Sequence, residues 1–136
     1  MQVGTKPATP ATKELYNDME DRTLLDEDQS DNYDSVVQEL MYLCKRARSD
    51  IKSALSYLCT KVSKPNQGDS AKLDRVLDFL KATKGDKRII GATNLDKLMT
   101  WVDASYAMRS HTGGMMSFGI GALHTKLTKQ KLNTKS

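Results

Sequence analysis

The sequence predicts an α+β protein in which a three-helix segment precedes a small antiparallel β-meander. Apolar residues recur at intervals of three and four between residues 33 and 86, the period of helices with one buried face. After residue 87 apolar and polar residues alternate instead, which is the period of a strand. The 136 residues are enough for one domain with a modest core or for two smaller units.

Residues 1–32 are expected to form an acidic, largely disordered leader. They hold two of the three prolines and few large apolar side chains. Residues 1–35 contain nine acids and three bases, a net charge of −6, whereas residues 36–136 carry a net charge of +10. A basic body is compatible with binding to a phosphate backbone, but it is equally typical of a solvated lysine-rich surface.

Three helices are expected before residue 87. The first begins at Tyr33 and ends at the basic residues 45–48, whose charge suits a helix C-terminus. The second begins at the Ser-Asp cap of residues 49–50 and is closed by Pro65, and the third covers residues 69–86. Short amphipathic helices with short connections are expected to pack as a small bundle.

Four strands are expected after the helices, over residues 88–91, 97–103, 113–119 and 122–127. Gly119 and Gly121 supply the backbone freedom that a tight hairpin between the last two strands needs. In the second strand, alternation places Met99, Trp101 and Asp103 on one face.

Composition excludes several classes of protein. No apolar run approaches the length of about 20 residues needed to cross a bilayer, and the N-terminus lacks a secretory signal. The expected location is therefore intracellular and cytoplasmic, with no membrane partner. Cys44 and Cys59 are too few for a four-ligand zinc site and are expected to be reduced thiols in the core.

Asp103 is the last acid of the chain and stands at the end of a strand, just before a turn. From the residues alone, an Asp that hydrogen-bonds its own turn is the simpler interpretation. The alternative is a metal ligand, but two-metal hydrolysis needs several converging carboxylates. Asp96 is seven residues earlier, too far along an extended chain of about 3.3 Å per residue to share an ion with it.

Several blocks of sequence resemble one family. Residues 101–107 (WVDASYA), 110–114 (SHTGG) and 129–136 (KQKLNTKS) closely resemble the start of the ribonuclease H domain in the Pol polyprotein of copia-type LTR retrotransposons. Residues 33–83 resemble the helical segment that connects the reverse transcriptase to that domain, although Ser49 replaces a usual proline and Asp69 a common histidine.

The resemblance implies a domain organisation and a parent activity. Residues 33–86 would be the helical connection, and residues 87–136 a truncated ribonuclease H-like β segment. The parent polyprotein would copy RNA into DNA and cleave the RNA of RNA:DNA hybrids with Mg²⁺. The rest of the Pol polyprotein is accordingly an expected partner.

The resemblance also implies an incomplete catalytic site. Asp103 would be its catalytic carboxylate and metal ligand, but the family's next acidic ligand lies in a helix after the segment that matches residues 133–136. No Tyr-x-Asp-Asp polymerase motif is present either. We therefore expect this chain alone to bind no Mg²⁺ and to have no catalytic activity. A sheet without its covering helices is expected to expose apolar faces and open edges.

An RNA:DNA hybrid is the expected ligand, bound weakly. Residues 104–136 contain five bases and no acid, a composition suited to a phosphate-tracking groove. The candidate contacts are hydroxyl and cationic side chains, namely Ser105, Arg109, Ser110, Thr112, Lys126, Lys129 and Lys131. A polar hairpin turn is the alternative interpretation of residues 110–112. A different function altogether, a small helical protein-interaction module without catalysis, is also open.

Overall fold

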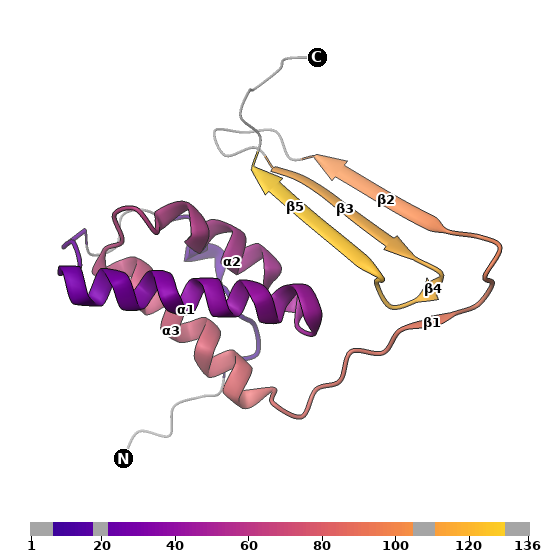
Figure 1. Cartoon of the computed structure of the whole chain (residues 1–136), viewed down its shortest axis with the longest axis horizontal. Coiled ribbons are helices and arrows are strands. Elements are labelled where there is room, and N and C mark those ends of the chain that lie inside the picture. Colours follow the sequence, from indigo (N-terminus) through magenta and orange to yellow (C-terminus); the bar gives the residue numbers. More distant parts are fainter. Residues whose placement is uncertain (1–6, 18–21, 105–110, 130–136) are drawn as a thin grey trace. The chain divides into compact units, whose positions relative to one another are not determined.

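The structure is a computed structural model that describes residues 7–17, 22–104 and 111–129. The chain divides into two compact units, a helical unit, Met1–Asp86, and a β unit, Lys87–Ser136. Within the described residues, α-helices occur in the first unit and antiparallel sheets in the second (Figure 1), which confirms the prediction of an α+β fold. The division falls where the apolar period of the sequence changes.

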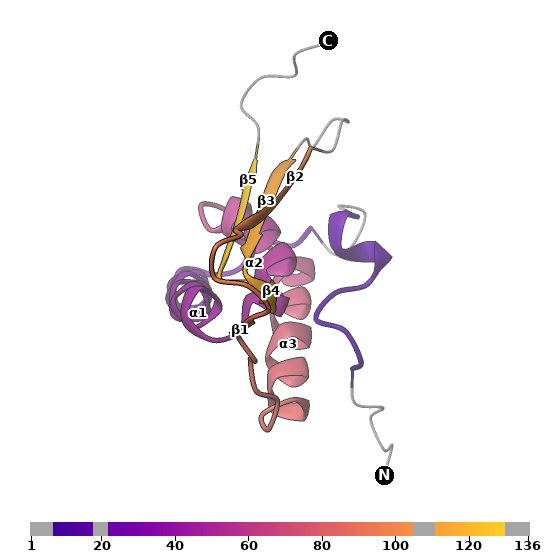
Figure 2. The same ribbon diagram turned by 90° about the vertical axis from the view of Figure 1, so that its right-hand side faces the viewer.

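The described residues of the helical unit form three α-helices, with one short 3₁₀ turn before the first helix and one in each connection between helices. The helices are α1 (Glu27–Arg46), α2 (Lys52–Leu58) and α3 (Gln67–Ala82). The 3₁₀ turns are η1 (Lys13–Tyr16), η2 (Ser49–Ile51) and η3 (Cys59–Lys61). Turned by 90°, the unit shows α2 and α3 lying between α1 and the N-terminal segment that carries η1 (Figure 2).

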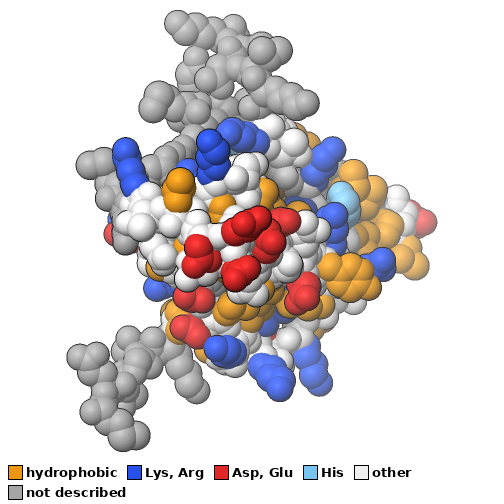
Figure 3. Space-filling model, turned by 60° about the vertical axis from the view of Figure 1, so that its left-hand side comes forward, with side chains coloured by type: hydrophobic (Ala, Val, Ile, Leu, Met, Phe, Trp, Pro, Cys, Tyr) orange, Lys and Arg blue, Asp and Glu red, His pale blue; other side chains and the backbone are white. Residues whose placement is uncertain are grey.

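Helix α1 begins six residues before Tyr33, where the sequence was expected to leave a disordered leader. The Asp26 side chain caps the helix by accepting a hydrogen bond from the Gln29 N–H at 2.8 Å. Glu27 and Asp28 place negative charge in the first turn, where it interacts favourably with the helix dipole. Figure 3 shows acidic side chains gathered over the end of the helical unit where α1 begins.

The N-terminal segment also contributes to the hydrophobic core. Leu15 is buried, and the neighbouring Tyr16 ring meets the Tyr57 ring edge-on at 5.4 Å between centroids. Further along, Leu24 forms an isolated β-bridge with Asn66. The expectation of a largely disordered leader is therefore wrong for residues 13–16, which form η1 and pack on the core through Leu15 and Tyr16, and for residues 27–32, which form the capped start of α1.

The core of the helical unit consists of apolar side chains from all three α-helices and from η1 and η2. Its largest fully buried apolar members are Val37, Ile51, Leu55, Leu58 and Val76. The Tyr33 hydroxyl donates a hydrogen bond to the Leu58 carbonyl at 3.2 Å, so this buried polar group has a partner. Burial, with a contribution from the Asp69 charge, raises the pKa of Tyr33.

Arg48 joins the α1–α2 connection to the end of α3. Its guanidinium contacts both carboxylate oxygens of Asp50, at 3.0 Å and 2.7 Å. It also donates to the Thr83 carbonyl at 3.1 Å and to the Thr83 hydroxyl at 2.6 Å. Because Thr83 is the C-cap residue of α3, Arg48 adds donors at the end of this helix, where the Thr83 carbonyl also accepts a hydrogen bond from the Asp86 N–H at 3.0 Å.

The Arg48–Asp50 pair predicts an acid-sensitive helical unit. The hydrogen bond from Arg48 lowers the pKa of Asp50, so the contribution of this carboxylate to stability is complete above its ordinary pKa of about 3.9 and is lost as the pH falls through the lowered value. Urea midpoints followed by helical circular dichroism should therefore fall from about pH 4 downward. The Asp50→Asn variant should show a smaller fall; an equal fall would contradict the assignment.

In the part of the β unit that the structure describes, the strands form one three-stranded sheet and one short strand pair. Strands β2 (Met99–Ala104), β3 (His111–Ser117) and β5 (His124–Lys129) form an antiparallel sheet in the order β2-β3-β5. Strands β1 (Gly91–Ala92) and β4 (Gly119–Ile120) pair with each other. The expected strand at residues 88–91 is thus reduced to two residues, and the other three shift by one or two positions.

The connection between β3 and β5 requires its two glycines. Gly119 has a φ of 120° and Gly121 a φ of 69°, both in the region that favours glycine. A Cβ on Gly121 would lie 2.0 Å from the Ile89 carbonyl oxygen. The connection is longer than the expected tight hairpin, because Gly119 and Ile120 themselves form β4 and pair with β1.

The β unit leaves most of its apolar side chains exposed. Ser117 is the one buried residue among those described in this unit, and its hydroxyl donates to the Gly121 carbonyl. Figure 3 shows hydrophobic side chains at the surface around a histidine, and both histidines of the chain belong to the β unit. The exposed large apolar residues here are Ile89, Ile90, Leu95, Leu98, Trp101, Val102, Met115, Met116, Ile120 and Leu123.

Candidate nucleic-acid interface

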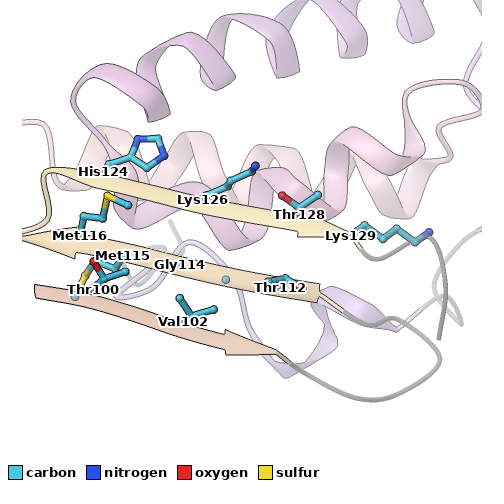
Figure 4. Close-up of a pocket in the computed structure, with 11 residues that line it drawn as sticks. Thr100, Val102, Thr112, Gly114, Met115, Met116, His124, Lys126, Thr128 and Lys129 are labelled. Carbon is cyan, nitrogen blue, oxygen red and sulfur yellow. The ribbon is translucent and has the colours of Figure 1, made fainter. Parts of the chain in front are cut away.

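One face of the three-stranded sheet carries a shallow hollow of about 480 Å³. The antiparallel register places side chains from the three strands in rows across this face. One row contains Val102, Gly114 and Lys126, and another contains Thr112 and Thr128. Figure 4 shows these residues on their strands, with Thr100, Met116 and His124 in the remaining row.

The hollow follows from a glycine in the central strand. Gly114 leaves the middle of β3 without a side chain on this face, between Val102 on one side and Lys126 on the other, whereas its neighbour Gly113 belongs to the opposite face, between Asp103 and Leu127. A Cβ at Gly114 would have the Trp101 carbonyl oxygen at 3.7 Å as its nearest neighbour, so a side chain would fit there without a clash. Gly114 is therefore not required by the backbone at this point, and its effect is to keep this face open.

The charge around the hollow is entirely basic. Lys126 and Lys129 come from β5, His124 starts the same strand, and no acid lines the hollow. Thr112 and Thr128 add hydroxyls, whereas Val102 and Met116 are apolar. A surface of this kind offers cations and hydroxyls to phosphate and sugar groups, and an apolar floor to a flat ring.

Asp103 lies on the opposite face of the sheet from Thr112 and Lys126. It stands across from Gly113 in the register, whereas Thr112 and Lys126 belong to the alternate positions. Lys129, the last residue of β5, shares the register positions of Asp103 and borders the hollow at the end of the strand. The Asp103 carboxylate is exposed and accepts a hydrogen bond from the Ala104 N–H at 2.8 Å. This contact lies within β2, and the turn that Asp103 was expected to hydrogen-bond lies outside the described residues.

The described residues gather no cluster of acids around Asp103 that could hold a metal ion. Asp96 lies in the loop before β2, where its N–H donates to the Asn94 side chain at 2.8 Å. Over the described residues, no three side chains of His, Cys, Asp or Glu come close enough together to hold a metal ion. A Mg²⁺ pair therefore does not fit the residues that the structure describes, and we derive no catalytic step.

Part of the predicted contact set is placed by the structure. Thr112, Lys126 and Lys129 line the hollow, whereas Asp103 does not. Ser105, Arg109, Ser110 and Lys131 lie outside the described residues. Sequence reasoning missed Thr100, Val102, His124 and Thr128, although alternation along each strand would have placed them on the face of Thr112 or Lys126 once the register was known.

Comparisons with protein-family models, with curated proteins and with solved structures found no match to this chain. The resemblance to retrotransposon polyproteins therefore rests on the sequence blocks alone. No helix in the described part of the chain is both long and apolar enough to span a membrane.

Proposed function

We propose that this chain is a piece of a copia-type retrotransposon Pol polyprotein whose β unit contacts an RNA:DNA hybrid without cleaving it. The single observation that carries the binding proposal is the hollow lined by Thr112 and Lys126, and bordered by Lys129 at the end of β5, with no acid among its lining residues. The sequence blocks at residues 33–83 and 101–136 support the family assignment. The parent polyprotein would supply DNA synthesis and RNA cleavage.

The order of the strands is compatible with this assignment. Asp103 lies on the first strand of a three-stranded antiparallel meander, the position that the resemblance assigns to a ribonuclease H carboxylate. In this proposal the helical unit is the connection between polymerase and nuclease. Asp103 would act in catalysis only with further acids from the parent polyprotein, since the described residues form no group of three side chains that could hold a metal ion.

The basic face explains why a hybrid would bind. Each phosphate neutralised by a lysine releases condensed counterions, so binding weakens steeply as salt rises. Hydroxyls of Thr112 and Thr128 can hydrogen-bond the 2′-hydroxyls that distinguish RNA from DNA. We therefore expect a hybrid to bind more tightly than duplex DNA of the same sequence.

Reversing the lysine charges tests this proposal. The variant Lys126→Glu/Lys129→Glu should weaken binding to a labelled RNA:DNA hybrid about tenfold or more and reduce the slope of log K against log salt by about two. Fluorescence anisotropy over a salt series measures both quantities. Both residues are exposed, so the fold should be retained.

A matched variant separates the effect of these two positions on hybrid binding from the effect of the net charge of the chain. Lys64→Glu/Lys84→Glu makes the same change in charge at two exposed lysines of the helical unit. It should lower affinity far less than the β5 variant. Equal losses in the two variants, or native binding that does not respond to salt, would contradict a specific face on the β unit.

A protein-interaction module remains a second candidate function, because the helical unit has a hydrophobic core of its own. A groove of about 400 Å³ beside α1, lined by Met41, Tyr42 and Val62 among others, offers a surface for it. The two functions differ in their response to salt. A protein partner retained at high salt, with no affinity for the hybrid, would favour this candidate.

A further inference from the structure

The two edges of the three-stranded sheet differ in their protection. An edge strand presents unpaired backbone N–H and C=O groups, and proteins commonly blunt such edges with lysine or proline. Strand β5 carries Lys126 and Lys129 on one edge. Strand β2 forms the other edge, and Met99–Ala104 contains neither lysine nor proline. No strand within the described residues pairs with the outer side of β2, which Figure 1 shows at the border of the sheet.

Strand β2 is also apolar on both of its faces. Trp101 is 48% exposed on one face, and Val102 is 73% exposed on the other. Leu98, which directly precedes the strand, is 51% exposed. An open edge flanked by exposed apolar side chains on both faces is a site for pairing with another strand.

The segment at residues 97–103, KLMTWVD, is complementary to itself in the antiparallel direction. When Thr100 faces Thr100 of a second copy, each residue pairs with the residue that lies equally far on the other side of Thr100. Lys97 meets Asp103, Leu98 meets Val102, and Met99 meets Trp101, and each pair occurs twice by symmetry. Opposite charges, apolar pairs and Thr–Thr pairs are the cross-strand combinations that stabilise sheets. Lys97 and Asp103 are both exposed and thus available for such pairs.

Neighbouring registers are less favourable. A two-fold axis perpendicular to the sheet places the same face of both copies on the same side. Two residues that pair must then belong to the same face, so the pairing can be centred on a residue but not between two residues. Centring the pairing on Trp101 places Met99 against Asp103, and centring it on Val102 places Trp101 against Asp103. Only the register centred on Thr100 places both carboxylates opposite lysines while matching all apolar residues with each other.

We propose that two copies of this chain associate through the β2 edge, with residues 97–103 paired antiparallel about Thr100. The two three-stranded sheets then form one continuous sheet. A second copy, rather than another strand, is inferred because the segment matches itself in charge as well as in apolar pairs. This dimer is independent of the proposed hybrid binding, so its test contains no nucleic acid.

Charge swaps test the register in the full chain. Lys97→Asp places two acids opposite each other, and Asp103→Lys places two lysines opposite each other. Each single variant should raise the dimer dissociation constant about tenfold or more, whereas the double variant should restore the native value. Sedimentation over a concentration series measures it. Lys126→Asp, on the lysine-bearing edge, is the control and should leave dimerisation unchanged.

A native chain that stays monomeric at all soluble concentrations would overturn the proposal. A double variant that dimerises no more tightly than the single variants would also overturn it, since a non-specific apolar association does not depend on pairing of opposite charges.

A cysteine at the axis provides a second test. Residues directly opposite in an antiparallel pair have Cα atoms about 4.5–5.5 Å apart, within the range that a disulfide spans. Under mild oxidation Thr100→Cys should form a covalent dimer joined at position 100, identified by peptide mass. Thr128→Cys, exposed on the β5 strand, is the matched control and should cross-link far less. Equal cross-linking at the two positions would exclude pairing through β2.

Discussion

Replacing Leu15 with alanine is expected to lower the free energy of unfolding of the helical unit by about 2–4 kcal/mol. Leu15 is only 6% exposed and belongs to the same core as Leu55 and Leu58 of α2. Truncating it removes buried apolar surface and leaves a cavity that neighbouring side chains fill only in part. Urea unfolding followed by helical circular dichroism measures the loss.

Leu24→Ala is the matched control, because it is the same change at a residue that is 62% exposed. Its effect should stay within about 0.5 kcal/mol. If the two variants proved equally stable, the N-terminal segment would not be packed on the helices. A large loss at Leu15 alone would show that this segment is part of the folded unit and not a removable leader.

The leader illustrates why the sequence predicts some elements and not others. Its acidic residues suggested disorder, yet Asp26 caps α1 and Glu27 and Asp28 occupy the first helical turn. The same residues are a helix-start signal when a periodic apolar segment follows them. Leu15 carried no such signal, because one apolar residue in a polar segment has no period from which burial can be inferred.

The candidate site likewise has features that the sequence predicts and features that it does not. Alternation within each strand predicts which residues share a face, and it correctly separates Trp101 from Val102. It cannot predict which residues of different strands are neighbours, because the register depends on the connections between strands. The sequence therefore gave no reason to place Thr112 beside Lys126 rather than beside Asp103, and the hollow at Gly113 and Gly114 is visible only in the structure.

Arg48→Ala is expected to destabilise the helical unit by about 2–4 kcal/mol, because one side chain makes several charge-assisted hydrogen bonds at once. The Arg48 side chain is 12% exposed, so water can replace only some of the hydrogen bonds that the variant loses. Truncation leaves the Thr83 carbonyl without this donor at the end of α3. It also removes the cation over the Phe79 ring, at 5.5 Å from its centroid, and the partner of Asp50.

Two further variants show which property of Arg48 matters. Arg46→Ala removes another arginine, one that lies over the exposed Tyr42 ring, and should cost at most about 0.5 kcal/mol. Arg48→Lys keeps the charge but loses the planar fork that reaches Asp50 and Thr83 together, so it should recover only a small part of the stability. Full recovery by lysine would mean that charge alone is sufficient. If Arg48→Lys and Arg48→Ala instead unfold at similar urea concentrations, the arginine acts through its hydrogen-bond geometry, by fixing the end of α3 against the α1–α2 connection.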